Sequence, residues 1–151
     1  MVNSFRLLIF LSILVSVILS SIAYSLPPRA MLSNPAPDTG DRFGSSVSVC
    51  GDVAVVGALQ DNSGASLSGS AYIFSPSSSQ WFMTDQLTPE VPADNARFGC
   101  SVAAGTDTVI IGSLGDNTSG AFSGTAYVFT SSGMTWSRQE MLTATDAASY
   151  D

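Results

Sequence analysis

The amino-acid sequence predicts an all-β protein built from two copies of one four-stranded antiparallel unit. Three observations support this prediction. Glycines and aromatic residues recur at one fixed spacing, that between Phe43-Gly44 and Phe98-Gly99. No helical periodicity of apolar residues is visible after Ser25. Short apolar runs alternate there with clusters of Gly, Ser, Asn and Asp, which is typical of strands and turns.

The repeat covers a whole unit. Further pairs at the same spacing are Gly57 and Gly112, Asp61 and Asp116, Asn62 and Asn117, Gly69 and Gly124, Tyr72 and Tyr127, Phe74 and Phe129, and Trp81 and Trp136. Matches of this density indicate modular units that each bury an apolar face against the next unit.

Each unit offers four strands in the same order. The predicted strands are residues 46–50, 53–59, 70–75 and 80–87 in the first unit, and 101–105, 108–114, 125–130 and 135–142 in the second. Gly51-Asp52 is a two-residue turn suited to a tight hairpin. We expect one set of side chains, with its counterparts in the second unit, to form the core between the units. The set is Val47, Val55, Tyr72, Phe74 and Trp81.

The segment 1–25 has the layout of a secretory signal peptide. One positive charge precedes an apolar stretch from Leu7 to Leu19, and small residues follow at Ala23 and Ser25. The alternative is an uncleaved anchor, because the stretch from Leu7 to Tyr24 is close to the minimum of about 17 residues that cross a bilayer. After cleavage we expect no membrane insertion. Both alternatives place the remainder outside the cytosol.

The rest of the chain divides at the repeat. The predicted segments are a linker at 26–40, a first unit at 41–92, a second unit at 93–145 and the start of a truncated third unit at 146–151. Within the linker, residues 29–33 are predicted to form a stray outer strand, since Leu32 is in register with Leu87 and Leu142. The pattern is typical of a truncated product or of a fragment of a longer gene.

Charge excludes several classes of function. The net charge is −7, and the chain has no histidine. After the signal segment the only basic side chains are those of Arg29, Arg42, Arg97 and Arg138. A nucleic-acid surface needs clustered cations, and an anionic membrane surface attracts them, so neither partner is expected. Without imidazole, and with no catalytic constellation visible, we expect no enzyme activity and no cofactor.

The two cysteines are expected to be free. An even number of cysteines in a secreted protein invites a disulfide. However, Cys100 corresponds to Ser45 at the start of a strand, whereas Cys50 corresponds to Gly105 at its end. In parallel-running units these positions lie about 16 Å apart, at the rise of a strand, and a disulfide needs Cα atoms within about 7 Å. Free thiols are therefore the preferred interpretation, and a disulfide is the alternative.

Three sequence elements recur in order and resemble the FG-GAP repeat. The first copy reads Phe43-Gly44-Ser45-Ser46-Val47, Val55-Val56-Gly57-Ala58 and Gly69-Ser70-Ala71-Tyr72-Ile73-Phe74, and the second reads Phe98-Gly99-Cys100-Ser101-Val102, Ile110-Ile111-Gly112-Ser113 and Gly124-Thr125-Ala126-Tyr127-Val128-Phe129. The resemblance covers residues 29–151. It implies two complete β-propeller blades of four antiparallel strands, an incomplete propeller, as in the extracellular head of integrin α-subunits and in many secreted microbial proteins.

The family's calcium loop does not carry over. Many FG-GAP units hold calcium in an acidic loop between the first two strands, but here that connection is only Cys50-Gly51-Asp52 or Gly105-Thr106-Asp107. One carboxylate cannot supply the six to eight oxygens that calcium prefers. The proline of the Gly-Ala-Pro element is also replaced, by Leu59 and by Leu114.

A second acidic loop follows the second strand of each unit, at Asp61-Asn62 and Asp116-Asn117. It is a weak candidate for a cation or ligand site, and turn capping by the Asx side chains is the preferred interpretation. Asn117-Thr118-Ser119 is also an N-glycosylation sequon, which predicts modification of Asn117 in a eukaryotic secretory route. Arg42 and Arg97, which precede the Phe-Gly pairs, are expected to be solvated or to bridge the blades.

These features predict a non-catalytic secreted or cell-surface module, on the extracellular face, that binds a protein or glycan ligand in adhesion. The alternatives are the amino-terminal part of a larger secreted hydrolase or surface receptor with its chemistry downstream, and a degenerate product without a role of its own. Because propellers use about four to eight blades, two blades leave edges open. We therefore expect self-association through these edges.

Overall fold

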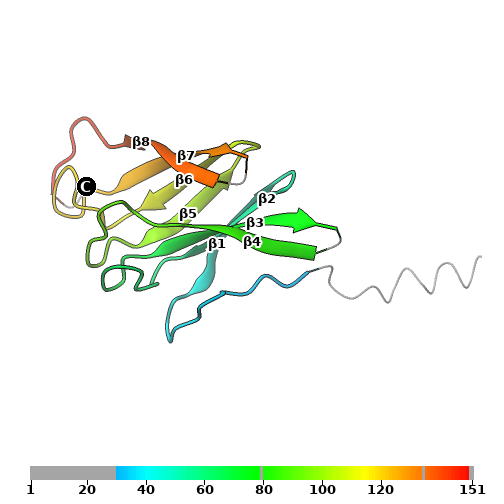
Figure 1. Ribbon diagram of the computed structural model, residues 1–151. Helices are drawn as coiled ribbons and strands as arrows, with labels where there is room; N and C mark the ends of the chain where they lie inside the picture. The colour runs from blue at the N-terminus through cyan, green and yellow to red at the C-terminus, as the bar shows by residue number, and fades with distance from the viewer. Residues whose placement is uncertain (1–29, 79, 134, 150–151) are drawn as a thin grey trace, which may run out of the picture. The chain divides into compact units, whose positions relative to one another are not determined.

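The computed structural model describes residues 30–78, 80–133 and 135–149, and these residues form two four-stranded antiparallel sheets (Figure 1). The first sheet contains β1 (Phe43–Cys50), β2 (Val53–Ala58), β3 (Ser70–Ser77) and β4 (Gln80–Leu87), and the second contains β5 (Phe98–Ala104), β6 (Thr108–Ser113), β7 (Thr125–Ser132) and β8 (Thr135–Leu142). In both sheets the strands lie in chain order. The predicted all-β fold of two repeated blades is confirmed.

The strand bounds differ from the predicted ones chiefly at the Phe-Gly pairs. β1 and β5 begin at Phe43 and Phe98, so each pair belongs to its strand, and a bulge follows it in both sheets. A second bulge recurs between β3 and β4 and between β7 and β8. Residues 30–33 of the predicted stray strand form no strand. In each sheet the fourth strand pairs with the third, and the described residues contain no strand before residues 30–33 that could take the place of the third.

Each sheet has two chemically distinct faces. Paired residues of neighbouring antiparallel strands share a face, and successive residues alternate between faces. Pairing of Val56 with Tyr72 and of Ala54 with Phe74 defines what we call the aromatic face of the first sheet. Pairing of Val55 with Ile73 defines its aliphatic face. The second sheet repeats this division.

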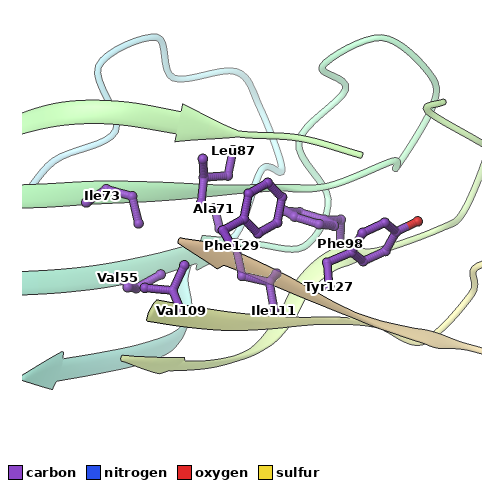
Figure 2. Packing of buried hydrophobic residues seen from close by; sticks show 9 residues of the cluster. All are labelled: Val55, Ala71, Ile73, Leu87, Phe98, Val109, Ile111, Tyr127 and Phe129. Atoms are coloured by element: carbon purple, nitrogen blue, oxygen red, sulfur yellow. The ribbon is translucent and has the colours of Figure 1, made fainter. Parts of the chain in front are cut away.

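The main core lies between the two sheets, within the compact unit Leu32–Asp151. The aliphatic face of the first sheet packs there against the aromatic face of the second (Figure 2). The buried members are Val55, Ala71, Ile73 and Leu87 from the first sheet, and Phe98, Val109, Ile111, Tyr127 and Phe129 from the second. Removal of so much apolar surface from water is the dominant stabilising contribution to the stack.

The predicted core was right for Val55 and wrong for four residues of the first unit. Tyr72 and Phe74 are buried, but they belong to a second cluster on the opposite face of the first sheet, with Trp81 packed against it. Val47 shares that face and is largely exposed. The reason is the direction of stacking, because an aromatic face contacts the preceding unit. The counterparts in the second unit, Val102, Tyr127, Phe129 and Trp136, have such a unit to contact.

Leu32 takes part in the second cluster. It packs with Phe43 and Trp81 against the buried aromatic residues of the first sheet. Its counterpart at the repeat spacing, Leu87, packs in the same way on the aromatic face of the second sheet. The linker therefore provides the packing contact expected from the register of these leucines, although it forms no strand.

Close backbone contacts join the two sheets at their inner strands. β5 contacts β1 and β2 most extensively, and the contact between β4 and β8 is much smaller. The Phe98 amide donates a hydrogen bond to the carbonyl oxygen of Ser68 (2.8 Å), and the Ser46 hydroxyl donates one to the carbonyl oxygen of Gly99 (2.7 Å). A Cβ atom on Gly57 would lie 2.1 Å from that same Gly99 oxygen, so the approach requires glycine.

The predicted signal segment at residues 1–25 lies outside the described residues. In the part of the chain that the structure describes, no helix is long and apolar enough to cross a membrane.

Candidate functional site

The acidic loops that follow β2 and β6 are stabilised by their own carboxylates. Asp61 and Asp116 are buried. The Tyr72 hydroxyl donates a hydrogen bond to Asp61 Oδ2, and the Tyr127 hydroxyl donates one to Asp116 Oδ2, each at 2.5 Å. The other oxygen of Asp61 accepts hydrogen bonds from the amide and hydroxyl of Ser63, at 2.9 and 2.7 Å. This is the geometry of an Asx turn.

Burial and hydrogen bonding set the protonation of these pairs. Burial raises the pKa of Tyr72 and of Tyr127, and the hydrogen bond to the neighbouring carboxylate and its negative charge raise each pKa further. Burial opposes ionisation of Asp116, but the hydrogen bonds from Thr118 and Tyr127 outweigh burial and lower the pKa of Asp116. Each tyrosine therefore remains a donor to its aspartate over the physiological range.

The asparagine of each loop supports the same turn. Asn62 Oδ1 accepts a hydrogen bond from the Leu67 amide (2.9 Å), and Asn117 Oδ1 accepts one from the Phe122 amide (2.7 Å). Among the residues described, no three Asp, Glu, His or Cys side chains gather in a way that could hold a metal ion. Asn117 is exposed on its loop. The four residues singled out from the sequence thus lie in two separate turns, one per sheet.

The Phe-Gly pairs place aromatic rings in the packed clusters and contribute no reactive side chain. The Phe98 ring packs edge-on against Tyr127, with ring centroids 5.3 Å apart, and Phe43 packs against Tyr72 with centroids 5.6 Å apart. Arg97 has a left-handed backbone (φ 55°), and its amide donates a hydrogen bond to the Leu67 carbonyl oxygen (3.1 Å) across the sheets. The left-handed backbone at Arg97 turns the chain so that the next residue, Phe98, enters the core.

The two thiols lie on different strands. Cys50 ends β1 and Cys100 lies in β5, and each is a free, partly buried cysteine.

A groove with a volume of about 740 Å³ opens between the sheets at the end that carries the β1–β2 and β3–β4 turns. The first sheet contributes Phe82 and Met83 from β4, and the second contributes Trp136 from β8. The inner strands are in close contact, whereas β4 and β8, which border the groove, contact each other much less. Its volume lies within the range of about 300–1,000 Å³ that is typical of ligand sites.

Polar groups from hairpin turns border the apolar wall of the groove. Asp52 and Asp107 come from the β1–β2 and β5–β6 turns, and Ser77 and Ser131 come from the ends of β3 and β7. No basic side chain is among the described residues that line it. The arrangement combines a large aromatic surface with hydroxyl and carboxylate groups, which suits a neutral or cationic ligand with an apolar part.

Sequence reasoning did not find this groove. Trp136 is a repeat position, which the repeat alone assigns to the core. Phe82 and Met83 correspond to Ser137 and Arg138 in the second unit, so they depart from the repeat. The signal that could have indicated the groove was the presence of large apolar residues in one copy only. A position that serves only the packing of a blade has a similar residue in each copy.

No curated protein matches the chain. The FG-GAP repeat family model matches it twice, over residues 30–74 and 81–129. Each match contains one Phe-Gly pair, the first two strands of that sheet and part of the third. The repeated sheets, the Phe-Gly geometry and these two matches agree, and the chain therefore belongs to the FG-GAP repeat family.

Proposed function

We propose that this protein is a non-catalytic extracellular binding module, which holds a protein or glycan ligand in the groove between its two blades. FG-GAP repeats are typical of extracellular proteins, occur often in adhesion proteins, and are typically non-catalytic. Family membership supports a non-catalytic extracellular binding function, and the groove supports the proposed location of the ligand.

The groove itself is the observation that carries the proposal. Phe82 is half exposed, and both it and Trp136 line this concave surface. Exposed aromatic side chains in a concave site contribute large contact areas at low entropic cost and are frequent in binding hot spots. A sugar ring or an aromatic or aliphatic peptide side chain fits such a wall.

The carboxylates define the ligand more narrowly. Asp52 and Asp107 lie on the β1–β2 and β5–β6 turns, one from each sheet, and both line the groove. Negative charge on both sides disfavours an acidic ligand, and it attracts a cationic group or accepts hydrogen bonds from sugar hydroxyls. We therefore favour neutral glycans and peptides with basic side chains over acidic ligands.

A binding screen with matched variants tests this proposal. The purified chain is applied to a glycan array and to an array of peptides with basic, neutral or acidic side chains. For each positive probe, Phe82→Ala and Asp107→Asn are compared with the wild type. We expect each variant to weaken binding about tenfold, the equivalent of one strong contact.

The control is Val91→Ala, which truncates an exposed side chain in the β4–β5 connection, outside the groove. Its affinity should equal that of the wild type. Binding that survives Phe82→Ala and Asp107→Asn unchanged, or binding only to acidic probes, would contradict the proposal.

Export and modification are tested separately in a eukaryotic secretory host. We expect the chain in the medium, shortened by its signal segment and carrying a glycan on Asn117, which is exposed and lies in a sequon. Enzymatic removal of N-glycans should lower the mass of the wild type and leave that of Asn117→Gln unchanged. Retention of the unshortened chain in the membrane fraction would contradict export by a cleaved signal.

A further inference from the structure

The two outward faces of the stack repeat the two faces that pack together at its centre. At the centre, the aliphatic face of the first sheet contacts the aromatic face of the second. The described residues leave two faces open, namely the aromatic face of the first sheet at its inner strands and the aliphatic face of the second sheet. We propose that copies of this chain dock head to tail, with the aliphatic face of the second sheet of one copy on the aromatic face of the first sheet of the next.

The aromatic face of the first sheet exposes apolar side chains on its innermost strand. Val47 is 70% exposed and Val49 is 67% exposed. Their counterparts on β5, Val102 and Ala104, are partly buried against the central core because the first sheet packs on them. The difference in exposure between the two copies of this strand marks the place of a missing neighbour.

The aliphatic face of the second sheet shows the complementary difference. Ile110 is 41% exposed, whereas its counterpart Val55 is fully buried at 0%. Val128 is half-buried, whereas its counterpart Ile73 is also fully buried. The open face therefore carries side chains of the same kind and size as the face that packs at the centre.

The glycines that permit close packing are present on both open faces. At the centre, a Cβ atom on Gly57 would meet the Gly99 carbonyl oxygen at 2.1 Å. The counterparts of these two residues are Gly112 on the aliphatic face and Gly44 on the aromatic face. A Cβ atom on Gly44 would meet nothing within 4 Å, and one on Gly112 would meet chiefly the hydroxyl of Ser101. Both positions leave room for a neighbouring backbone.

The polar contacts of the centre also have counterparts. Ser46 donates a hydrogen bond to the Gly99 carbonyl oxygen, and the Trp136 amide donates one to Asp85 Oδ2 (3.1 Å). Between two copies, the corresponding pair at the inner strands is Ser101 with the Gly44 carbonyl oxygen, whereas the counterpart of the second contact, Trp81 with Glu140, lies at β4 and β8, outside the inner strands. One contact is not reproduced. At the centre the Ser48 hydroxyl accepts a hydrogen bond from the Ala104 amide, but the counterpart of Ser48 in the second sheet is Ala103, which has no hydroxyl.

Docking is assigned to the inner strands. At the outer part of the aromatic face Leu32 already packs on the cluster of Tyr72 and Phe74. The open area therefore lies at β1, and by the geometry of the centre it would contact β5 and β6 of the neighbouring copy. A contact between two different faces is heterologous, so each copy keeps one face available for a further copy.

Sedimentation velocity of the full chain over a range of concentrations tests the proposal. We expect the wild type to associate as concentration rises. Val47→Asp with Val49→Asp places two carboxylates in the contact and should raise the dissociation constant by about 100-fold. Both side chains are largely exposed in the single chain, so the fold should persist. The matched control, Val91→Asp, adds a charge at an exposed valine outside both faces and should associate like the wild type.

A mixing experiment tests the head-to-tail polarity. Gly112→Ala blocks the aliphatic face with a Cβ atom, at the cost only of moving the Ser101 hydroxyl in the same chain. Neither Gly112→Ala nor the double valine variant should associate alone, but an equimolar mixture should form a dimer, because each supplies the face that the other lacks. A wild type that stays monomeric, a variant that associates alone as the wild type does, or a mixture without dimer would overturn the proposal.

Discussion

At the scale of single residues, the tyrosine–aspartate pairs link the second and third strands of each sheet to the loop between them. The Tyr127 hydroxyl reaches across that loop to Asp116, whose other oxygen accepts hydrogen bonds from the amide and hydroxyl of Thr118. A buried carboxylate with this many donors is stabilised in its ionised form. Its contribution to folding therefore depends on pH.

The lowered pKa of Asp116 fixes the sign of that dependence. The folded state prefers the ionised carboxylate, so the stabilisation is fully present above the ordinary value of 3.8 and is lost as pH falls below it. We expect Asp116→Asn to cost about 1–3 kcal/mol near neutral pH, since hydrogen bonds to a charged group are weakened. As pH falls below 3.8, the difference between variant and wild type should shrink.

Chemical denaturation of both proteins across this pH range measures the difference. The substitution of an exposed residue, Asp146→Asn, serves as the control for loss of one negative charge. A gap between Asp116→Asn and wild type that stays constant from neutral to acid pH would contradict the assigned role of this carboxylate.

At the scale of the strands, the sequence correctly predicted where the strands lie along the chain, but it did not predict which face of each sheet packs against the other sheet. The repeat placed all eight strands in their order, because turns and apolar runs are local signals. Alternation along a strand also placed Tyr72 and Phe74 on one face, and both are buried in the same cluster. It could not show which face meets the next sheet, because that depends on the direction in which the sheets stack. Val47 was therefore assigned to a core, and its face is open.

Equivalent glycines in the two sheets provide a direct test of the stacking. Gly57→Ala would place Cβ at 2.1 Å from the backbone oxygen of Gly99, whereas Gly112→Ala meets chiefly a hydroxyl that can rotate. We expect Gly57→Ala to destabilise the fold by about 1–3 kcal/mol or more, as overpacking does, and Gly112→Ala by clearly less.

Thermal unfolding at a concentration at which the chain is monomeric compares the two variants. Equal destabilisation by both substitutions would mean that Gly57 does not lie at a contact between sheets.

At the scale of the whole molecule, stacking produces features that no single repeat contains. The groove lies between two similar sheets that contact each other extensively where β5 meets β1 and β2 and much less where β4 meets β8. Its lining comes from turns of different units that lie far apart in the sequence, such as those of Asp52 and Asp107. The sequence predicted these turns singly, but it could not predict that they border one concave surface.

Calcium should contribute little to the stability of the molecule. The short β1–β2 and β5–β6 turns offer one aspartate each, and the oxygens of Asp61 are occupied by hydrogen bonds. A ligand that binds only the folded state raises its melting temperature. We therefore expect the melting temperature to change little when excess calcium is replaced by a chelator, as calorimetry would show. A decrease of several degrees with chelator would mean that a calcium site exists.

The packing of the aliphatic face of the first sheet on the aromatic face of the second is the claim on which the groove and the docking proposal both depend. Val55 and Val109 are fully buried and lie side by side in that core (Figure 2). Nuclear Overhauser measurements on the methyl-labelled chain test this contact directly. We predict strong cross-peaks between the methyl groups of Val55 and Val109 that persist on dilution. Cross-peaks confined to neighbours within each sheet would contradict the account.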